Sequence, residues 1–104
     1  MSNMTEREKG FETKFALDEE QRFRAIVRRN RLLGSWAAGL MGRSDADAYA
    51  QSVVEADFEE VGDDDVLRKV GGDLKAAGVA VSDEEIRSKM LEFMAKAATQ
   101  VQQG

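Results

Sequence analysis

The sequence predicts an all-α fold, a four-helix bundle-like domain with a mobile N-terminal arm. Three observations predict it: apolar residues recur at helical spacing in four segments, glycines interrupt the chain between most of them, and no stretch alternates apolar and polar residues as a half-buried strand does. A chain of 104 residues is long enough for one modest core. We therefore expect residues 1–17 to form the arm and residues 18–104 to form the domain.

The first expected helix covers residues 18–41, and the rest of the domain is built around it. On a helical wheel at about 100° per residue, one face is apolar enough that it must be buried. This face consists of Phe23, Ile26, Val27, Asn30, Leu33, Gly34, Ala37, Leu40 and Met41. Gly42 then ends the helix as a left-handed cap. Leu32 and Trp36 fall on the other side, so either a further helix covers them or they form a binding patch.

The same helix is strongly basic. Between Gln21 and Ser44 the chain has six arginines and no acidic residue, whereas residues 32–104 carry seven basic and fourteen acidic residues. This basic helix either packs among acidic neighbours or offers a binding surface. We expect the arginine stems to cover apolar surface while the guanidinium groups stay in water. Those beside the apolar face are Arg22 and Arg29 on one flank and Arg24, Arg28 and Arg31 on the other.

The second expected helix covers residues 45–61 and is capped by Ser44 or Asp45. Its apolar stripe consists of Ala46, Tyr49, Ala50, Val53, Val54 and Val61. Asp57 lies inside the arc of this stripe. We expect its carboxylate to cap the helix, to bridge to an arginine of the first helix, or to lie at the solvent margin, and not to act in catalysis.

The third expected helix covers residues 63–77, after a run of aspartates that favours a helix N-terminus, and Gly78 closes it. Gly71 and Gly72 lie in its interior and cost about 1 kcal/mol each relative to alanine, so we expect this helix to be the weakest or most bent. Its aligned apolar residues are Val66, Val70, Leu74 and Ala77.

The fourth expected helix covers residues 83–102 and has the clearest start in the sequence. Ser82 and Glu85 have capping-box spacing, and Val81 with Ile86 has the spacing of a hydrophobic staple. The buried stripe consists of Ile86, Met90, Phe93, Met94, Ala97 and Val101. Short connections between four such helices predict an antiparallel arrangement.

Composition limits the chemistry that the chain can perform. Cysteine and histidine are absent, which excludes disulfides and thiolate metal sites and removes the commonest general base. The acidic run 55–65 lacks the spacing of a calcium loop, and no apolar run reaches the roughly 18–20 residues of a membrane span. We therefore expect no catalytic residues, no metal, no cofactor and no membrane insertion. An acidic protein without clustered aromatic residues also argues against nucleic acid as a partner.

The N-terminal segment has an apolar face of its own. Met4, Phe11 and Phe15 share one helical face, and Thr5 with Glu8 has capping-box spacing. A short isolated helix is marginal in water, so this face needs a partner surface before the segment folds. On composition alone, a frayed terminus is the simpler interpretation.

A family resemblance covers nearly the whole chain. The sequence closely resembles the zeta subunit family of alphaproteobacterial F-type ATP synthases. The segments that carry the resemblance are Glu12–Glu20, Phe23–Ala25, Arg28–Ala38, Asp47–Ala50, Val53–Val54, Asp57–Phe58 and Gly62–Lys69.

The resemblance implies a four-helix inhibitor of ATP hydrolysis by the F1 sector. Its N-terminal segment is disordered when free, becomes helical, and wedges into a catalytic alpha/beta interface beside the gamma subunit. By position, residues 1–17 would be inhibitory. The arm residues that we expect to touch the partner are Met4, Phe11 and Phe15 as apolar anchors and Arg7, Glu8, Lys9, Glu12 and Lys14 as polar contacts.

The implied partners are the alpha, beta and gamma subunits of F1, which would hold a cytoplasmic protein at the inner membrane; we expect a monomer when it is free. A second partner surface is expected at Arg22, Arg28, Arg29, Arg31, Leu32 and Trp36. Two alternatives remain open at this stage. One is a helical adaptor that binds another protein through an exposed Leu32/Trp36 patch and the basic helix, and the other is a nucleic-acid binder through Arg22–Arg31.

Overall fold

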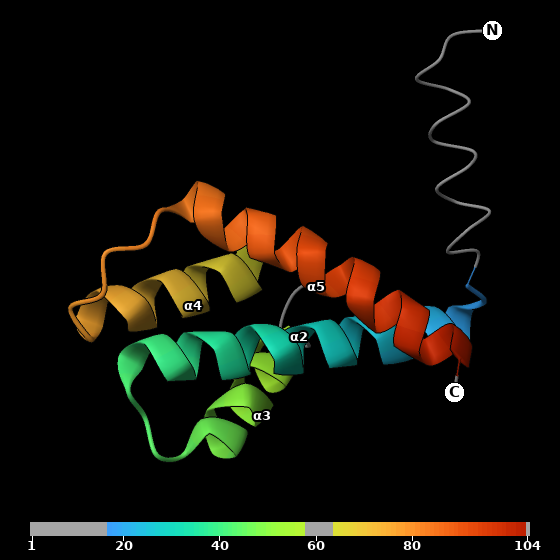
Figure 1. Cartoon of the computed structure of the whole chain (residues 1–104), viewed down its shortest axis with the longest axis horizontal. Helices are drawn as coiled ribbons and strands as arrows, with labels where there is room; N and C mark the ends of the chain where they lie inside the picture. The colour runs from blue at the N-terminus through green and yellow to red at the C-terminus, as the bar shows by residue number, and fades with distance from the viewer. Residues whose placement is uncertain (1–16, 58–63, 104) are drawn as a thin grey trace, which may run out of the picture.

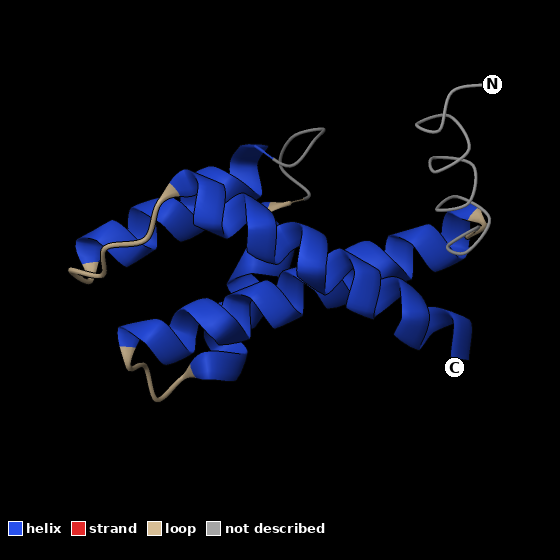
Figure 2. Ribbon diagram, turned by 45° about the horizontal axis from the view of Figure 1, so that its top comes forward, coloured by secondary structure: helices blue, strands red, loops and turns tan. Residues whose placement is uncertain are grey.

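The computed structural model describes residues 17–57 and 64–103. These ranges contain helices α2 (Glu19–Met41), α3 (Ala46–Ala56), α4 (Asp64–Ala76) and α5 (Asp83–Gln103), and no strand (Figures 1 and 2). The all-α prediction is confirmed. The second helix was expected to run to residue 61, but α3 ends at Ala56 and Asp57 lies in a turn. Residues 58–61, with Val61 of its expected stripe, lie outside the described ranges, as does the arm up to residue 16.

Helix α2 forms the axis of the domain. Helix α5 runs along it in the opposite direction, and α3 packs on another side of its C-terminal half (Figure 1). Helix α4 contacts all three other helices less extensively. The N-terminal end of α2 and the C-terminal end of α5 therefore lie together, away from α3 and α4 (Figures 1 and 2).

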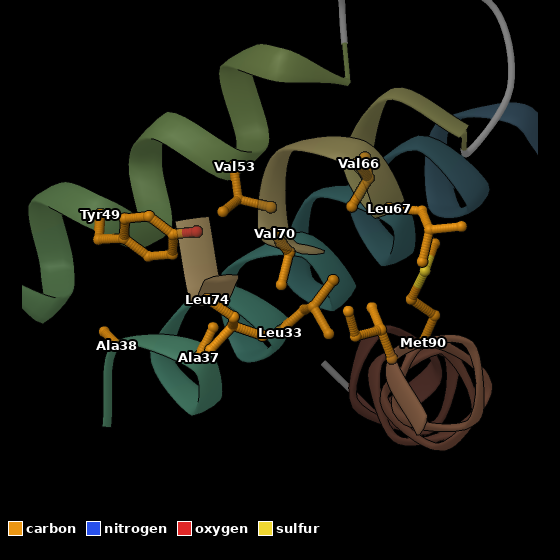
Figure 3. Packing of buried hydrophobic residues seen from close by; sticks show 11 residues of the cluster. Leu33, Ala37, Ala38, Tyr49, Val53, Val66, Leu67, Val70, Leu74 and Met90 are labelled. Atoms are coloured by element: carbon orange, nitrogen blue, oxygen red, sulfur yellow. The ribbon is translucent and has the colours of Figure 1, made fainter. Parts of the chain in front are cut away.

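The main core lies where all four helices meet. Figure 3 shows Leu33 of α2, Val53 of α3, Val70 and Leu74 of α4 and Met90 of α5 converging on one another. Each fully buried side chain of this size contributes about 1.5–3 kcal/mol. The buried residues of this cluster are Leu33, Ala37, Ala38, Tyr49, Val53, Val66, Leu67, Val70, Leu74, Ile86 and Met90.

A second, smaller cluster lies where only α2 and α5 meet. It consists of Ala25 on α2 and Ala97 and Val101 on α5, with Leu17 and Met94 packed against it. Leu17 precedes α2, so this cluster reaches back to the first residue that the structure describes.

Local signals in the sequence place several helix ends correctly. Gly42 has φ 69° and Gly78 has φ 77°, so both lie in the left-handed region expected of them. The hydroxyl of Ser82 accepts a hydrogen bond from the backbone N–H of Glu85 at 3.1 Å, as expected for the cap of α5. Asp45 occupies the N-cap position of α3 but makes no side-chain cap bond there, because both its carboxylate oxygens accept hydrogen bonds from Arg43.

The buried arc of α2 differs from the expected stripe. Phe23 and Leu40, placed on the buried face by the helical wheel, are 54 % and 44 % exposed. Phe23 lies near the start of α2, which α3 does not reach (Figure 1), and Leu40 lies in the last turn of α2, where Met41 packs against the core instead. Conversely, Ala25 and Ala38 are fully or nearly fully buried although the wheel placed them outside the stripe. Helices on two sides of α2 widen its buried arc beyond a single stripe.

Candidate functional site

The expected site residues fall into two groups. The arm residues lie outside the described ranges: Met4, Arg7, Glu8, Lys9, Phe11, Glu12, Lys14 and Phe15. The expected second partner surface lies on α2 and is fully described. The structure keeps part of this surface exposed and buries the rest.

Three of its arginines are exposed and lie on α2 between neighbouring helices. Arg28 donates to the side-chain amide oxygen of Gln100 on α5 at 3.4 Å, and Arg31 donates to that of Gln51 on α3 at 3.3 Å. These partners are neutral, so among the described residues no carboxylate offsets the charge of Arg28 or Arg31. Arg22 is also exposed but lies on the other flank of the helix, so α2 carries positive charge on more than one side, which favours an acidic partner.

Arg29 does not belong to this surface. It is 4 % exposed, so the expectation that its guanidinium group stays in water was wrong. Its Nε donates to Oδ1 of Asn30 at 3.0 Å, and its terminal nitrogen lies 3.8 Å from Oδ2 of Asp57. Asn30 in turn donates to the same Asp57 oxygen at 3.0 Å. The bridge from Asp57 to an arginine of the first helix is confirmed, and it fastens the end of α3 to the middle of α2.

Leu32 and Trp36 are both partly buried. Trp36 packs against the main core, and Nζ of Lys89 on α5 lies 5.9 Å from the centre of its ring. The covering helix that the sequence left open for Trp36 is therefore α5. The alternative expectation, an exposed Leu32/Trp36 patch, does not hold for Trp36, which packs on the core beside Lys89 of α5, and Leu32 is partly buried as well.

The chain enters α2 through a capping box that the sequence analysis missed. Oδ1 of Asp18 accepts from the backbone N–H of Gln21 at 2.7 Å, and the backbone N–H of Asp18 donates to Oε1 of Gln21 at 3.2 Å. The signal was present as an aspartate followed three residues later by a glutamine. We call Leu17, Asp18 and Gln21 the arm root, because they form the junction between the expected arm and the domain.

A polar cluster joins α3 to α4. The hydroxyl of Tyr49 donates to Oδ2 of Asp73 at 2.8 Å, and Nζ of Lys69 lies 3.2 Å from the same oxygen. The guanidinium carbon of Arg43 lies 4.8 Å from the centre of the tyrosine ring. Burial, and then the hydrogen bond to Asp73, raise the pKa of Tyr49 above its ordinary value. The phenol therefore stays protonated at neutral pH and cannot act as a general base.

A shallow opening of about 390 Å³ lies between α3 and α4. Both acidic and basic side chains line it, and Asp65 and Arg68 form an ion pair across one turn of α4. Its lining residues are Ser52, Glu55, Ala56, Asp65, Arg68 and Lys69. Within the described ranges, no group of three or more acidic, cysteine or histidine side chains could hold a metal ion. No helix of the described chain is long and apolar enough to cross a membrane.

These features define a small all-helical protein with charged surfaces. The family model described as ATPase inhibitor subunit zeta matches residues 1–100, and the chain belongs to that family. The resemblance drawn from the sequence is thus confirmed, and family membership indicates a regulatory role on the F1 sector of an ATP synthase.

A solved structure supports the same fold. It is a solution NMR structure whose chain is 45% identical, with a TM-score of 0.69, and the match covers 79% of this chain and 95% of that one. The comparison with curated proteins gave no match.

Proposed function

We propose that the protein inhibits ATP hydrolysis by the F1 sector of a bacterial F-type ATP synthase, with its N-terminal arm folded as a helix in a catalytic alpha/beta interface against gamma. One observation carries the proposal: the inhibitor family matches residues 1–100, which span the arm and the domain together. The apolar face of Met4, Phe11 and Phe15 supplies the anchors that such an interface requires.

The proposed mechanism is steric. A helix in the interface prevents the catalytic site from completing its closure, so that gamma cannot turn in the hydrolysis direction. Rotation in the synthesis direction reopens the interface and expels the arm. Folding on binding costs conformational entropy, which lowers the affinity for a given contact area and keeps the inhibition reversible.

The exposed arginines of α2 support a second contact. Arg22, Arg28 and Arg31 face solvent, and the last two pair only with neutral amides among the described residues. We assign to them attraction of the domain to an acidic F1 surface, which acts mainly on the association rate. The protein would then be a cytoplasmic monomer when free and peripheral to the inner membrane through F1. The adaptor alternative loses support because α5 covers Trp36.

The test is ATP hydrolysis by F1 lacking its own zeta subunit, titrated with the full-length protein and with a form lacking residues 1–17. We expect inhibition by the full-length protein alone. Phe11→Ala with Phe15→Ala should weaken it by at least about tenfold, since each buried aromatic anchor contributes more than about 1 kcal/mol. Leu91→Ala is the matched control, because Leu91 is 75 % exposed on α5. Equal inhibition by both forms, or none by either, would contradict the proposal.

A further inference from the structure

We infer that the arm root, Leu17 with the Asp18–Gln21 capping box, is a positioning device that fixes the direction in which the arm leaves the domain. The inference rests on the proposed function, because it explains how the domain presents the arm to its partner. It adds a role for the start of α2 and the end of α5, which is to hold the point where the arm leaves the domain.

The capping box stops α2 at Glu19. Asp18 has φ −71° and ψ 176°, an extended conformation that turns the chain out of the helix. Its side chain and that of Gln21 satisfy each other's backbone N–H groups at 2.7 and 3.2 Å. An extension of α2 toward the N-terminus would require both bonds to break. A helix formed by the arm in a complex is therefore a separate rod with its own direction.

Leu17 holds the chain immediately before this cap. It is partly buried against the smaller cluster formed by Ala25 of α2 and by Ala97 and Val101 of α5. Two consecutive residues are thus fixed, one by packing on two helices and the next by two hydrogen bonds. A flexible tether would leave the exit direction of the arm undetermined, whereas this arrangement determines it.

The C-terminal part of α5 takes part in the same device. The smaller cluster is separate from the main core, and it contains no residue of α3 or α4. Ala25 and Ala97 are both 0 % exposed, and alanines allow close approach of the two helices. The bond from Arg28 to Gln100 lies in the same region. The last turns of α5 therefore brace the arm root through Leu17.

A fixed root and a flexible tether make different quantitative predictions. For a tether, a short insertion lowers the effective concentration of the arm only with about the −3/2 power of its length, which is less than about twofold here. For a fixed root, losing the exit direction removes preorganisation, and we expect inhibition to weaken by about tenfold or more.

The experiment titrates F1 lacking its zeta subunit with a variant carrying Gly-Ser-Gly-Ser between Leu17 and Asp18. We expect the concentration for half inhibition to rise by about tenfold or more, while the melting temperature of the domain falls by no more than about 8 °C, the shift expected when only the packing of Leu17 is lost. A rise of less than about twofold would overturn the inference. The form lacking residues 1–17 is measured in parallel: if it inhibits as well as the full-length protein, the proposed function itself fails.

Point variants separate positioning from stability. Asp18→Ala removes the cap and should weaken inhibition at least about threefold, whereas Asp18→Asn retains a good N-cap and should restore it. Ser82→Ala is the matched control, because it removes a cap of the same kind from α5, away from the arm root. If Ser82→Ala weakened inhibition as much as Asp18→Ala, general destabilisation would explain both, and the inference would be wrong.

Discussion

Burying an arginine side chain destabilises a fold unless an opposite charge lies close to it. For Arg29 that charge is the carboxylate of Asp57, just after the end of α3. Asp57 lies 3.8 Å from the guanidinium group of Arg29 and accepts a hydrogen bond from buried Asn30 at 3.0 Å. The carboxylate side chain is itself only 13% exposed. The three side chains therefore form one connected polar cluster, in which removal of any member takes away a hydrogen bond or a charge interaction from the other two.

Removal of the carboxylate tests this unit. Asp57→Ala should lower the free energy of unfolding by about 3 kcal/mol, because it removes a carboxylate 3.8 Å from the buried guanidinium of Arg29 and the acceptor of the buried Asn30 amide. Urea denaturation gives the value. The control is Glu20→Gln, which breaks the exposed pair with Arg24 and should cost less than about 1 kcal/mol. Similar losses for both variants would show that the Arg29 cluster contributes no more than a surface pair.

Tyr49 gives the second prediction at this scale. Its pKa is raised in the folded protein, chiefly by burial, so the folded state keeps the phenol proton where the unfolded chain loses it, above about pH 10. The unfolded state then binds fewer protons, and stability falls as pH rises. The contribution is complete below the unfolded pKa and is lost above it. Between about pH 8 and about pH 11, the wild type should lose more stability than Tyr49→Phe in urea unfolding. An equal loss would contradict the assignment.

At the scale of elements, α3 packs on α2 almost backbone to backbone. A Cβ atom at Gly34 would lie 2.6 Å from Cα of Ala50 and 3.2 Å from Cγ2 of Val53. The first contact is with backbone, so relief requires α3 to move as a whole. Gly34 therefore sets the spacing between the two helices that also carry the Arg29 and Asp57 cluster.

Alanine at this glycine should destabilise the domain. Gly34→Ala gains about 1 kcal/mol of helix propensity, but we expect a net loss of about 1–3 kcal/mol from overpacking. Gly39→Ala is the matched control on the same helix, since nothing lies within 4 Å of an added Cβ there. It should stabilise the protein by up to about 1 kcal/mol. Thermal or urea unfolding measures the stability of each variant. If both substitutions stabilised the protein, the close approach of α2 and α3 at Gly34 would be contradicted.

The sequence contains the signals for the ends of these elements but not those for their partners. Gly42, Gly78 and Ser82 were predictable because caps depend on residues within one turn. The burial of Arg29 and the exposure of Phe23 were not, because they depend on how far α3 extends along α2. The hydrogen bond from Tyr49 to Asp73 joins α3 to α4, and neither residue's sequence context predicts this pairing.

At the scale of the whole molecule, a four-helix region holds the main core, and a two-helix extension formed by α2 and α5 carries the arm root. All buried residues of the two clusters lie between Ala25 and Val101. Most of the candidate site could be predicted only through the family resemblance, because the anchors in the arm have no chemical motif of their own. The Asp18–Gln21 capping box can be recognised in the sequence. Its proposed role in fixing the arm's exit direction cannot, because that role depends on Leu17 packing against α5.

The last prediction is that the helical domain folds equally well without the N-terminal arm. A form lacking residues 1–16 keeps Leu17 and every residue of both clusters, so its melting temperature should stay within about 2 °C of the full-length value. Calorimetry or circular dichroism measures it. A fall of more than about 5 °C would mean that residues 1–16 stabilise the domain, and the form lacking residues 1–17, which removes Leu17 as well, would then not isolate the arm in the hydrolysis assay.

The antiparallel course of α2 and α5 has a practical result for anyone labelling this protein. Because α5 ends beside the start of α2, a purification tag or fluorescent protein fused after residue 104 would lie close to the arm root (Figure 1). Such a fusion should obstruct docking even though it leaves the arm sequence intact. A small dye attached in the connection between α4 and α5, at exposed Ala80, lies at the other end of the domain and offers the safer handle.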